Sequence, residues 1–242
     1  MPTIDRLWLI RLAELIAVVV LGLYFPKLVA LAASALHIPL WDMPLLHRAY
    51  LYFVLTVLVC LYVLARGESL ASIGLVPPKR WLVLIGRGLL VFVAILAFEI
   101  GVTPFLDPII AHATGTSAKL GETYFASVRG NLGLFLNLVS FGVFFGGLGE
   151  EILHRGFIMT RIAQLLGESR GAWIATVVLQ AIPFALGHAY QGPVGMFGVF
   201  VIAILYAIGA SAWGRNLWPA IVAHALFDTF GFWALYSGIA HA

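Results

Sequence analysis

Long apolar runs separated by short polar links make up most of this chain of 242 residues. Hydrophobic residues account for 62% of the sequence and charged residues for only 10%, against roughly 25% charged residues in soluble domains. Several runs approach the ~20 apolar residues that cross a bilayer as a helix, and none shows the alternation of a membrane β-strand. We therefore predict an all-α, polytopic integral membrane protein.

The apolar runs predict where the helices lie and also how the chain is organised. Residues 1–130 would form N-terminal transmembrane helices and a long polar loop at 107–130 that could include a short surface helix, and residues 131–242 the remaining helices of the same membrane domain. The expected helical segments are 10–36, 46–65, 81–105, 131–166, 172–188, 194–212 and 217–237.

The segment 131–166 is too long for one ordinary crossing. As a single α-helix it would measure about 54 Å, well beyond the thickness of a bilayer. Gly146, Gly147 and Gly149 therefore predict a break or strong bend just before Glu150. The chain would cross the membrane seven times without a reversal at this point and eight times with one.

The charge distribution argues against nucleic acid as a partner. The formal net charge is +3 and the isoelectric point is near 9.2, but the basic residues are dispersed among links and helix ends. Such a distribution is typical of the positive-inside rule for membrane proteins. Cys60 is the only cysteine, which excludes an internal disulfide. The pattern predicts a lipid bilayer as partner and no particular oligomeric state.

The densest group of ionisable side chains lies between two apolar runs, at Glu150, Glu151, His154 and Arg155. A charge near the bilayer centre costs at least ~2.5–3.5 kcal/mol, so such a group is by default a functional-site hypothesis. In an α-helix, Glu151 and Arg155 share a face, about 100° from the face of Glu150. We expect Glu151 and Arg155 to form an ion pair, which leaves Glu150 free to point at a reacting group.

Two further polar pairs interrupt apolar helices, Phe184 with His188 and His224 with Asp228. Glu150 and His188 each lie sixteen residues from the turn near 167–171, so they come out level in the membrane. His224 and Asp228 would lie roughly 10 and 16 Å up the last helix. One membrane cavity can therefore hold Glu150, His188, His224 and Asp228.

This set of side chains permits two mechanisms, both hydrolytic. In the first, His188, His224 and Asp228 ligate a metal, typically zinc, and Glu150 takes the proton of the bound water. In the second no metal is needed, because Glu150 activates water with His188 while His224 stabilises the oxyanion.

The three motifs together resemble a known family. Glu150-Glu151-x-x-x-Arg155, Phe184-x-x-x-His188 and His224-x-x-x-Asp228, in this order on membrane helices, are similar to the signature motifs of the CPBP intramembrane proteases, also called the CAAX protease or Abi family. The resemblance covers residues 131–237, and it implies that residues 131–242 form a CPBP-like catalytic core. It implies a core of seven or eight spans that hydrolyses a peptide bond in a membrane-associated protein or peptide.

The resemblance also implies a role for each motif residue. Glu150 would be the catalytic base, with Glu151, Arg155 and Phe184 in support. His188 and His224 would activate water, ligate a metal or bind the oxyanion. In this family many prokaryotic members are associated with bacteriocin maturation or immunity, while the eukaryotic branch cleaves prenylated CAAX proteins. We expect a prokaryotic plasma-membrane protein.

One position departs from the pattern of the CAAX-processing branch. The final motif position there is often Asn, whereas it is Asp228 here. An ionised Asp cannot donate a hydrogen bond to an oxyanion, although it is a good metal ligand. An oxyanion-binding role at this position and the processing of CAAX proteins are therefore less expected than other peptide hydrolysis.

Two other classes of function are compatible with the sequence. A non-catalytic membrane adaptor or bacteriocin-immunity-type protein would keep the fold and bind a partner peptide. A proton-coupled transporter would use Glu99 and Glu150 as a relay. The adaptor has little reason to bury so much costly charge.

Overall fold

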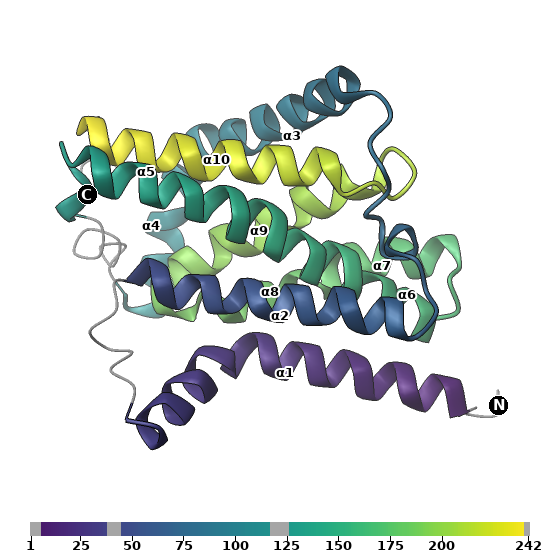
Figure 1. Cartoon of the computed structure of the whole chain (residues 1–242). Helices are drawn as coiled ribbons and strands as arrows, with labels where there is room; N and C mark the ends of the chain where they lie inside the picture. The colour runs from purple at the N-terminus through teal and green to yellow at the C-terminus, as the bar shows by residue number, and fades with distance from the viewer. Residues whose placement is uncertain (1–5, 38–44, 117–125, 240–242) are drawn as a thin grey trace.

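A computed structural model of the chain describes residues 6–37, 45–116 and 126–239 (Figure 1). These ranges contain helices and no strand, as expected for an all-α protein. Within them, five helical segments are long and apolar enough to cross a membrane, and 53–65 is a shorter apolar helix. The chain is an all-α, polytopic integral membrane protein. The five segments are Arg6–Phe25, Trp81–Gly101, Leu132–Leu165, Arg170–Gly187 and Ala189–Ser211.

The helices follow the predicted order closely, with short 3₁₀ turns between some of them. In chain order the elements are α1 (Arg6–Ala35), α2 (Leu45–Ala65), η2 (Leu70–Ile73), α3 (Trp81–Gly101), α4 (Thr103–Thr114), η4 (Ala126–Val128), α5 (Leu132–Phe141), η5 (Gly142–Ile158), α6 (Met159–Leu165), α7 (Arg170–Leu179), α8 (Ala181–Gly187), η6 (Ala189–Gln191), α9 (Gly192–Ser211) and α10 (Trp218–Ser237).

The loop predicted at 107–130, which could include a short surface helix, is helical over its first part. The helix expected to end at residue 105 ends at Gly101, and α4 follows almost at once with a proline in its first turn. Pro104 is compatible with the start of a helix because the amide it lacks is unpaired there anyway. The side chain of Thr103 also donates a hydrogen bond to the carbonyl oxygen of Glu99, which joins the two helices. Residues 117–125 of the predicted loop lie outside the described residues.

Of the break or strong bend predicted before Glu150, the break is wrong. Residues 132–165 form one continuous helix of 34 residues, in which α5 and α6 flank the π-helix η5. A π-helix is closed by i→i+5 hydrogen bonds. Because it has more residues in each turn, it advances less per residue than an α-helix. The wider winding makes this segment shorter than an α-helix with the same number of residues, and the segment counts as one candidate span.

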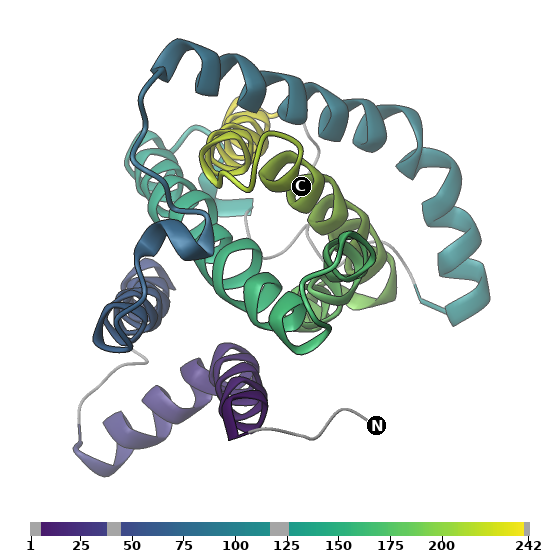
Figure 2. The same ribbon diagram turned by 90° about the vertical axis from the view of Figure 1, so that its right-hand side faces the viewer.

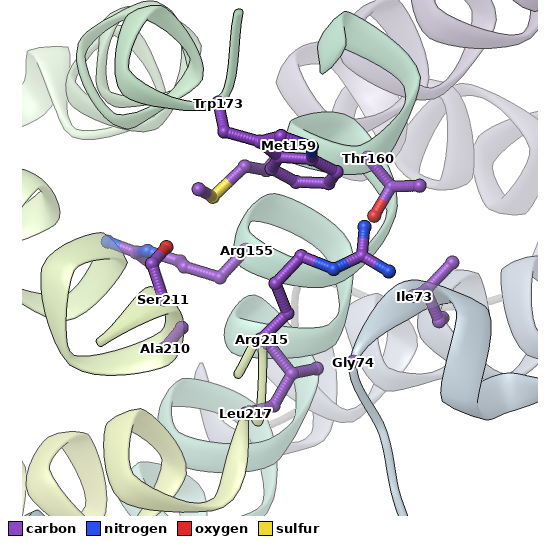
Figure 3. A pocket seen from close by; sticks show the side chains of 10 residues that line it. All are labelled: Ile73, Gly74, Arg155, Met159, Thr160, Trp173, Ala210, Ser211, Arg215 and Leu217. Atoms are coloured by element: carbon purple, nitrogen blue, oxygen red, sulfur yellow. The ribbon is translucent and has the colours of Figure 1, made fainter. Parts of the chain in front are cut away.

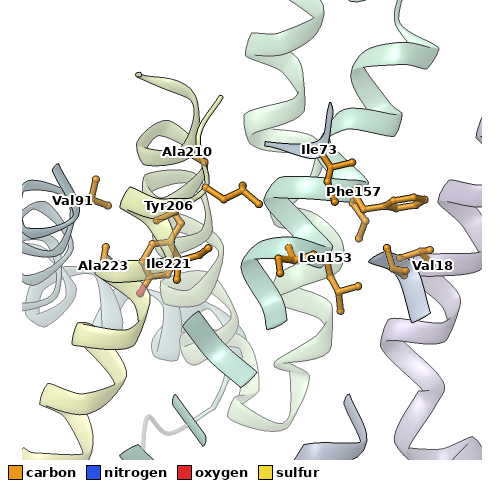
Figure 4. Close-up of a cluster of buried hydrophobic side chains, with 14 of the residues drawn as sticks. Val18, Ile73, Val91, Leu153, Phe157, Tyr206, Ala210, Ile221 and Ala223 are labelled. Atoms are coloured by element: carbon orange, nitrogen blue, oxygen red, sulfur yellow. The ribbon is translucent and has the colours of Figure 1, made fainter. Parts of the chain in front are cut away.

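The helix that carries η5 lies in the middle of the molecule. Helix α1 lies on one flank and α3 on the opposite flank, with α5, α9 and α10 between them (Figures 1 and 2). The buried core joins η5, α9 and α10, and Leu153, Phe157, Tyr206 and Ile221 are among its members (Figure 4). In lipid such helices associate largely through close packing. These three helices therefore form the frame on which polar side chains are positioned.

Buried ion pairs tie α1 to this frame. Arg161 on α6 is almost fully buried, and its guanidinium lies 2.6 Å from Glu14 on α1 and 2.8 Å from Glu68 in the link after α2. The hydroxyl of Tyr62 donates a hydrogen bond of 2.7 Å to Glu14. A buried charge is tolerated only when it is paired, so Arg161 fixes the N-terminal helices against the rest of the chain.

Candidate active site

Glu151 and Arg155 form the ion pair that their spacing predicts. Arg155 Nη1 donates to Glu151 Oε1 over 2.9 Å, and both side chains are fully buried. The guanidinium also lies 4.3 Å above the centre of the Phe184 ring. This pair places an ionised carboxylate inside η5 without leaving its charge unbalanced.

The same carboxylate holds His224 of α10. Glu151 Oε1 lies 2.8 Å from His224 Nδ1. An ionised carboxylate can only accept hydrogen bonds, so Nδ1 must carry the hydrogen. The opposite ring nitrogen, Nε2, lies 3.7 Å from Glu150 Oε2 and 3.8 Å from Asp228 Oδ1. His224 therefore connects the buried Glu151 with the two other carboxylates.

The sequence predicts that Glu150 and Glu151 point to different faces of the helix, but in the structure they share a neighbour. Glu150 and Glu151 both approach His224, one at each ring nitrogen. The wider turn of the π-helix reduces the angle between successive side chains below the 100° of an α-helix, which allows both to reach α10. Their exposure differs, since the Glu151 side chain is 0% exposed and that of Glu150 is 14% exposed. Glu150 is thus the glutamate that a substrate can reach.

His188 lies beside this group at the end of α8. Its Nδ1 is 2.9 Å from the carbonyl oxygen of Phe184, which can only accept, so Nδ1 is the donor and Nε2 is left available. His188 is near enough to His224 and Asp228 to interact with both electrostatically. The structure thus brings Glu150, His224 and Asp228 together and places His188 next to them.

Two glycines allow α10 to come this close to η5. A β-carbon at Gly142 would lie 2.6 Å from the β-carbon of Asp228. A β-carbon at Gly146 would overlap the Asp228 carboxylate and lie 3.2 Å from His224 Nε2. The Gly142-x-x-x-Gly146 spacing therefore provides the space that the polar side chains of α10 occupy.

Tyr206, Gln180 and Ala203 lie around this group and are outside the sequence motifs. Tyr206 of α9 stacks on the His224 ring with centroids 4.5 Å apart and an interplanar angle of 15°. Arg155 Nη2 and Gln180 Nε2 both donate to the carbonyl oxygen of Ala203, over 3.3 and 3.1 Å. Tyr206 and Gln180 are polar side chains within apolar runs, which is a signal that could have identified them.

A small cavity lies beside Arg155, a member of the ion pair. It has a volume of about 10 Å³, and its lining includes Arg155, Trp173 and Arg215 (Figure 3). A space of roughly 10–15 Å³ holds about one water molecule. This cavity is therefore too small to admit a peptide substrate.

Among the residues that the structure describes, no three His, Cys, Asp or Glu side chains are placed to hold a metal ion. The set His188, His224 and Asp228, expected from the sequence as possible zinc ligands, stays a prediction, as does the zinc-dependent mechanism.

A comparison with protein-family models gives a match at residues 132–230. That model is described as type II CAAX prenyl endopeptidase Rce1-like. This part of the chain is similar to that family. The range begins with α5 and includes all three motifs, so the resemblance to CAAX proteases is confirmed. The comparisons with curated proteins and with solved structures give no match.

We predict that Gly142→Ala destabilises the protein because its new methyl group meets the β-carbon of Asp228. Overpacking of this kind costs typically ~1–3 kcal/mol. Gly198→Ala on α9 is the matched control, since a β-carbon there has nothing within 4 Å and Ala favours helix by up to ~1 kcal/mol. Thermal unfolding in detergent should show a lower midpoint for Gly142→Ala only. Equal midpoints would contradict the close packing of α10 on η5.

Proposed function

We propose that the chain is an intramembrane endopeptidase that hydrolyses a peptide bond of a membrane-associated protein or peptide. The observation that supports this most is the position of His224. Its Nδ1 is bound by the buried Glu151, while its Nε2 faces Glu150 and Asp228. The similarity of residues 132–230 to a family described as endopeptidases supports the same reaction class.

In this proposal Glu150 activates the water. A base must lie about 2.6–3.2 Å from the oxygen whose proton it takes, so a water bound to Glu150 would lie beside His224 Nε2. Glu150 removes one proton, and the hydroxide oxygen bonds to the carbonyl carbon as the C=O electron pair moves onto oxygen. When that pair returns, the C–N bond breaks and Glu150 gives its proton to the departing amine.

The other motif residues assist the same step. His224, in its protonated form, presents an N–H at Nε2 to the oxyanion and is oriented through Nδ1. Preorganised donors of this kind are usually a large part of catalysis. Neutral His188, with Nδ1 donating to Phe184, has an accepting Nε2 that can help Glu150 to hold the water. Asp228, when ionised, accepts a hydrogen bond and so orients its neighbours instead of binding the oxyanion.

The two competing functions have less support. An adaptor does not require three carboxylates directed at one histidine inside a membrane protein, where each buried charge is costly. For the transporter, the charged neighbour described for Glu99 is Asp107 and not Glu150. A relay between Glu99 and Glu150 therefore lacks a link among the described residues.

The decisive test is Glu150→Gln in liposomes. Loss of a general base should lower kcat by about 10²–10⁴-fold, while thermal unfolding in detergent stays close to that of the original protein. Glu168→Gln, at an exposed turn, is the control and should cleave normally. A hydrophobic membrane peptide and a prenylated CAAX peptide, assayed side by side, identify the substrate class. Undiminished cleavage by Glu150→Gln would refute the proposal.

Metal dependence needs a separate measurement, with zinc content and cleavage recorded on the same purified sample. In the proposed metal-free reaction Glu150 activates the water and no residue has to bind zinc, so we expect cleavage to continue after chelation and Asp228→Asn to keep most of its activity. Asn keeps the size of Asp and is a poorer metal ligand. One zinc per chain, with loss of activity in both cases, would instead establish the zinc-dependent mechanism.

A further inference from the structure

A basic hollow of about 390 Å³ lies at the start of α3, away from the candidate active site. It is open to the surface, and its lining includes no acidic side chain. The lining of this basic hollow includes Pro77, Lys79, Arg80, Val83, Arg87 and Asn216.

Among the described residues, no carboxylate neutralises the cations of the basic hollow. Within the described ranges, no carboxylate forms an ion pair with Lys79, Arg80 or Arg87, whereas Arg66 and Arg161 both have acidic partners. Arg87 is held in place by the Trp213 ring, 5.2 Å from its guanidinium carbon. Three positive charges around one open space attract an anion, and guanidinium groups favour phosphate in particular.

Backbone and side-chain donors add to this attraction. The first turn of α3 begins at Trp81, directly beside Arg80, so its free N–H groups and the positive end of its dipole lie at the basic hollow. On the opposite wall Asn216 accepts from the backbone N–H of Trp218 through Oδ1, which leaves its NH₂ group as a donor.

The surroundings of the basic hollow are those of a membrane surface. Trp81 and Trp218 meet edge to face with centroids 5.1 Å apart, and Trp218 Nε1 donates to the carbonyl oxygen of Val76. Tryptophans of this kind gather at the level of the lipid headgroups. Along α3 an apolar surface continues from there, with Leu82 86% and Leu90 65% exposed. A soluble anion would make no contact with this apolar surface, whereas the acyl chains of a lipid can lie along it.

We propose that the basic hollow binds the phosphate group of an anionic phospholipid whose acyl chains lie along α3. Lys79, Arg80 and Arg87 contact the phosphate. Lipid binding at this site does not depend on the proposed peptidase reaction. The site is close to the packing of α3 on α10, however. A β-carbon at Gly88, the residue after Arg87, would lie 2.6 Å from Val222 of α10, two positions before His224. A bound lipid therefore braces the contact between α3 and α10.

Native mass spectrometry of the delipidated full chain tests this proposal with added phosphatidylglycerol, phosphatidylcholine or inorganic phosphate. Each cation near an anionic lipid surface contributes roughly fivefold to affinity. The double variant Lys79→Gln/Arg80→Gln, at two exposed positions, should thus bind phosphatidylglycerol about twenty-five-fold more weakly. Arg6→Gln/Arg170→Gln removes the same charge from exposed positions at the same end of the helices (Figure 1) and should bind normally.

The outcomes distinguish a lipid site from a general charge effect and from a site for soluble phosphate. The proposal is supported if the original protein retains phosphatidylglycerol better than phosphatidylcholine and only Lys79→Gln/Arg80→Gln loses phosphatidylglycerol binding. Equal loss in both double variants would mean a general charge effect and overturn it. Inorganic phosphate that displaces the lipid at equal concentration would show that the ligand is a soluble phosphate, and would overturn the lipid assignment. Arg87→Gln, if it folds, should weaken binding by a similar factor for one cation.

Discussion

The fully buried chain of contacts from Arg155 through Glu151 to His224 is the interaction on which the site depends. Placing ions in a low-dielectric interior costs several kcal/mol each, and removal of one partner typically costs ~3–5 kcal/mol. Here each charge has a partner, and the aromatic rings of Phe184 and Tyr206 enclose the guanidinium. The chain of contacts fixes one side of the His224 ring, so that its other nitrogen can face only Glu150 and Asp228.

The backbone of η5 makes this arrangement possible. Its π-helical winding lets Glu150 and Glu151 reach the same histidine, and Gly142 and Gly146 let α10 approach without a clash. Packing and polar chemistry are therefore not separate in this protein. The contact that holds α10 against η5 is also the one that positions the carboxylate of Asp228.

Hydropathy predicts most helices here because apolar runs of sufficient length have few alternatives in a bilayer. The motif residues could likewise be found, since a buried Glu150 or His224 is costly unless it serves a function. The π-helical winding could not be predicted, because the residue pattern does not specify whether backbone hydrogen bonds span four or five residues. Helix α4 is not evident in the sequence because its prolines and polar residues resemble a loop, and the stacking of Tyr206 on His224 depends on tertiary packing.

Glu151, and not Glu150, accepts the hydrogen bond that His224 donates through Nδ1. Nuclear magnetic resonance of ¹⁵N-histidine-labelled protein measures this directly, with the His224 signal assigned by comparison with His224→Gln. We predict a hydrogen on Nδ1 whose signal shifts in Glu151→Gln and changes little in Glu150→Gln. A spectrum in which Nδ1 carries no hydrogen, or in which only Glu150→Gln moves its signal, would contradict this account of the site.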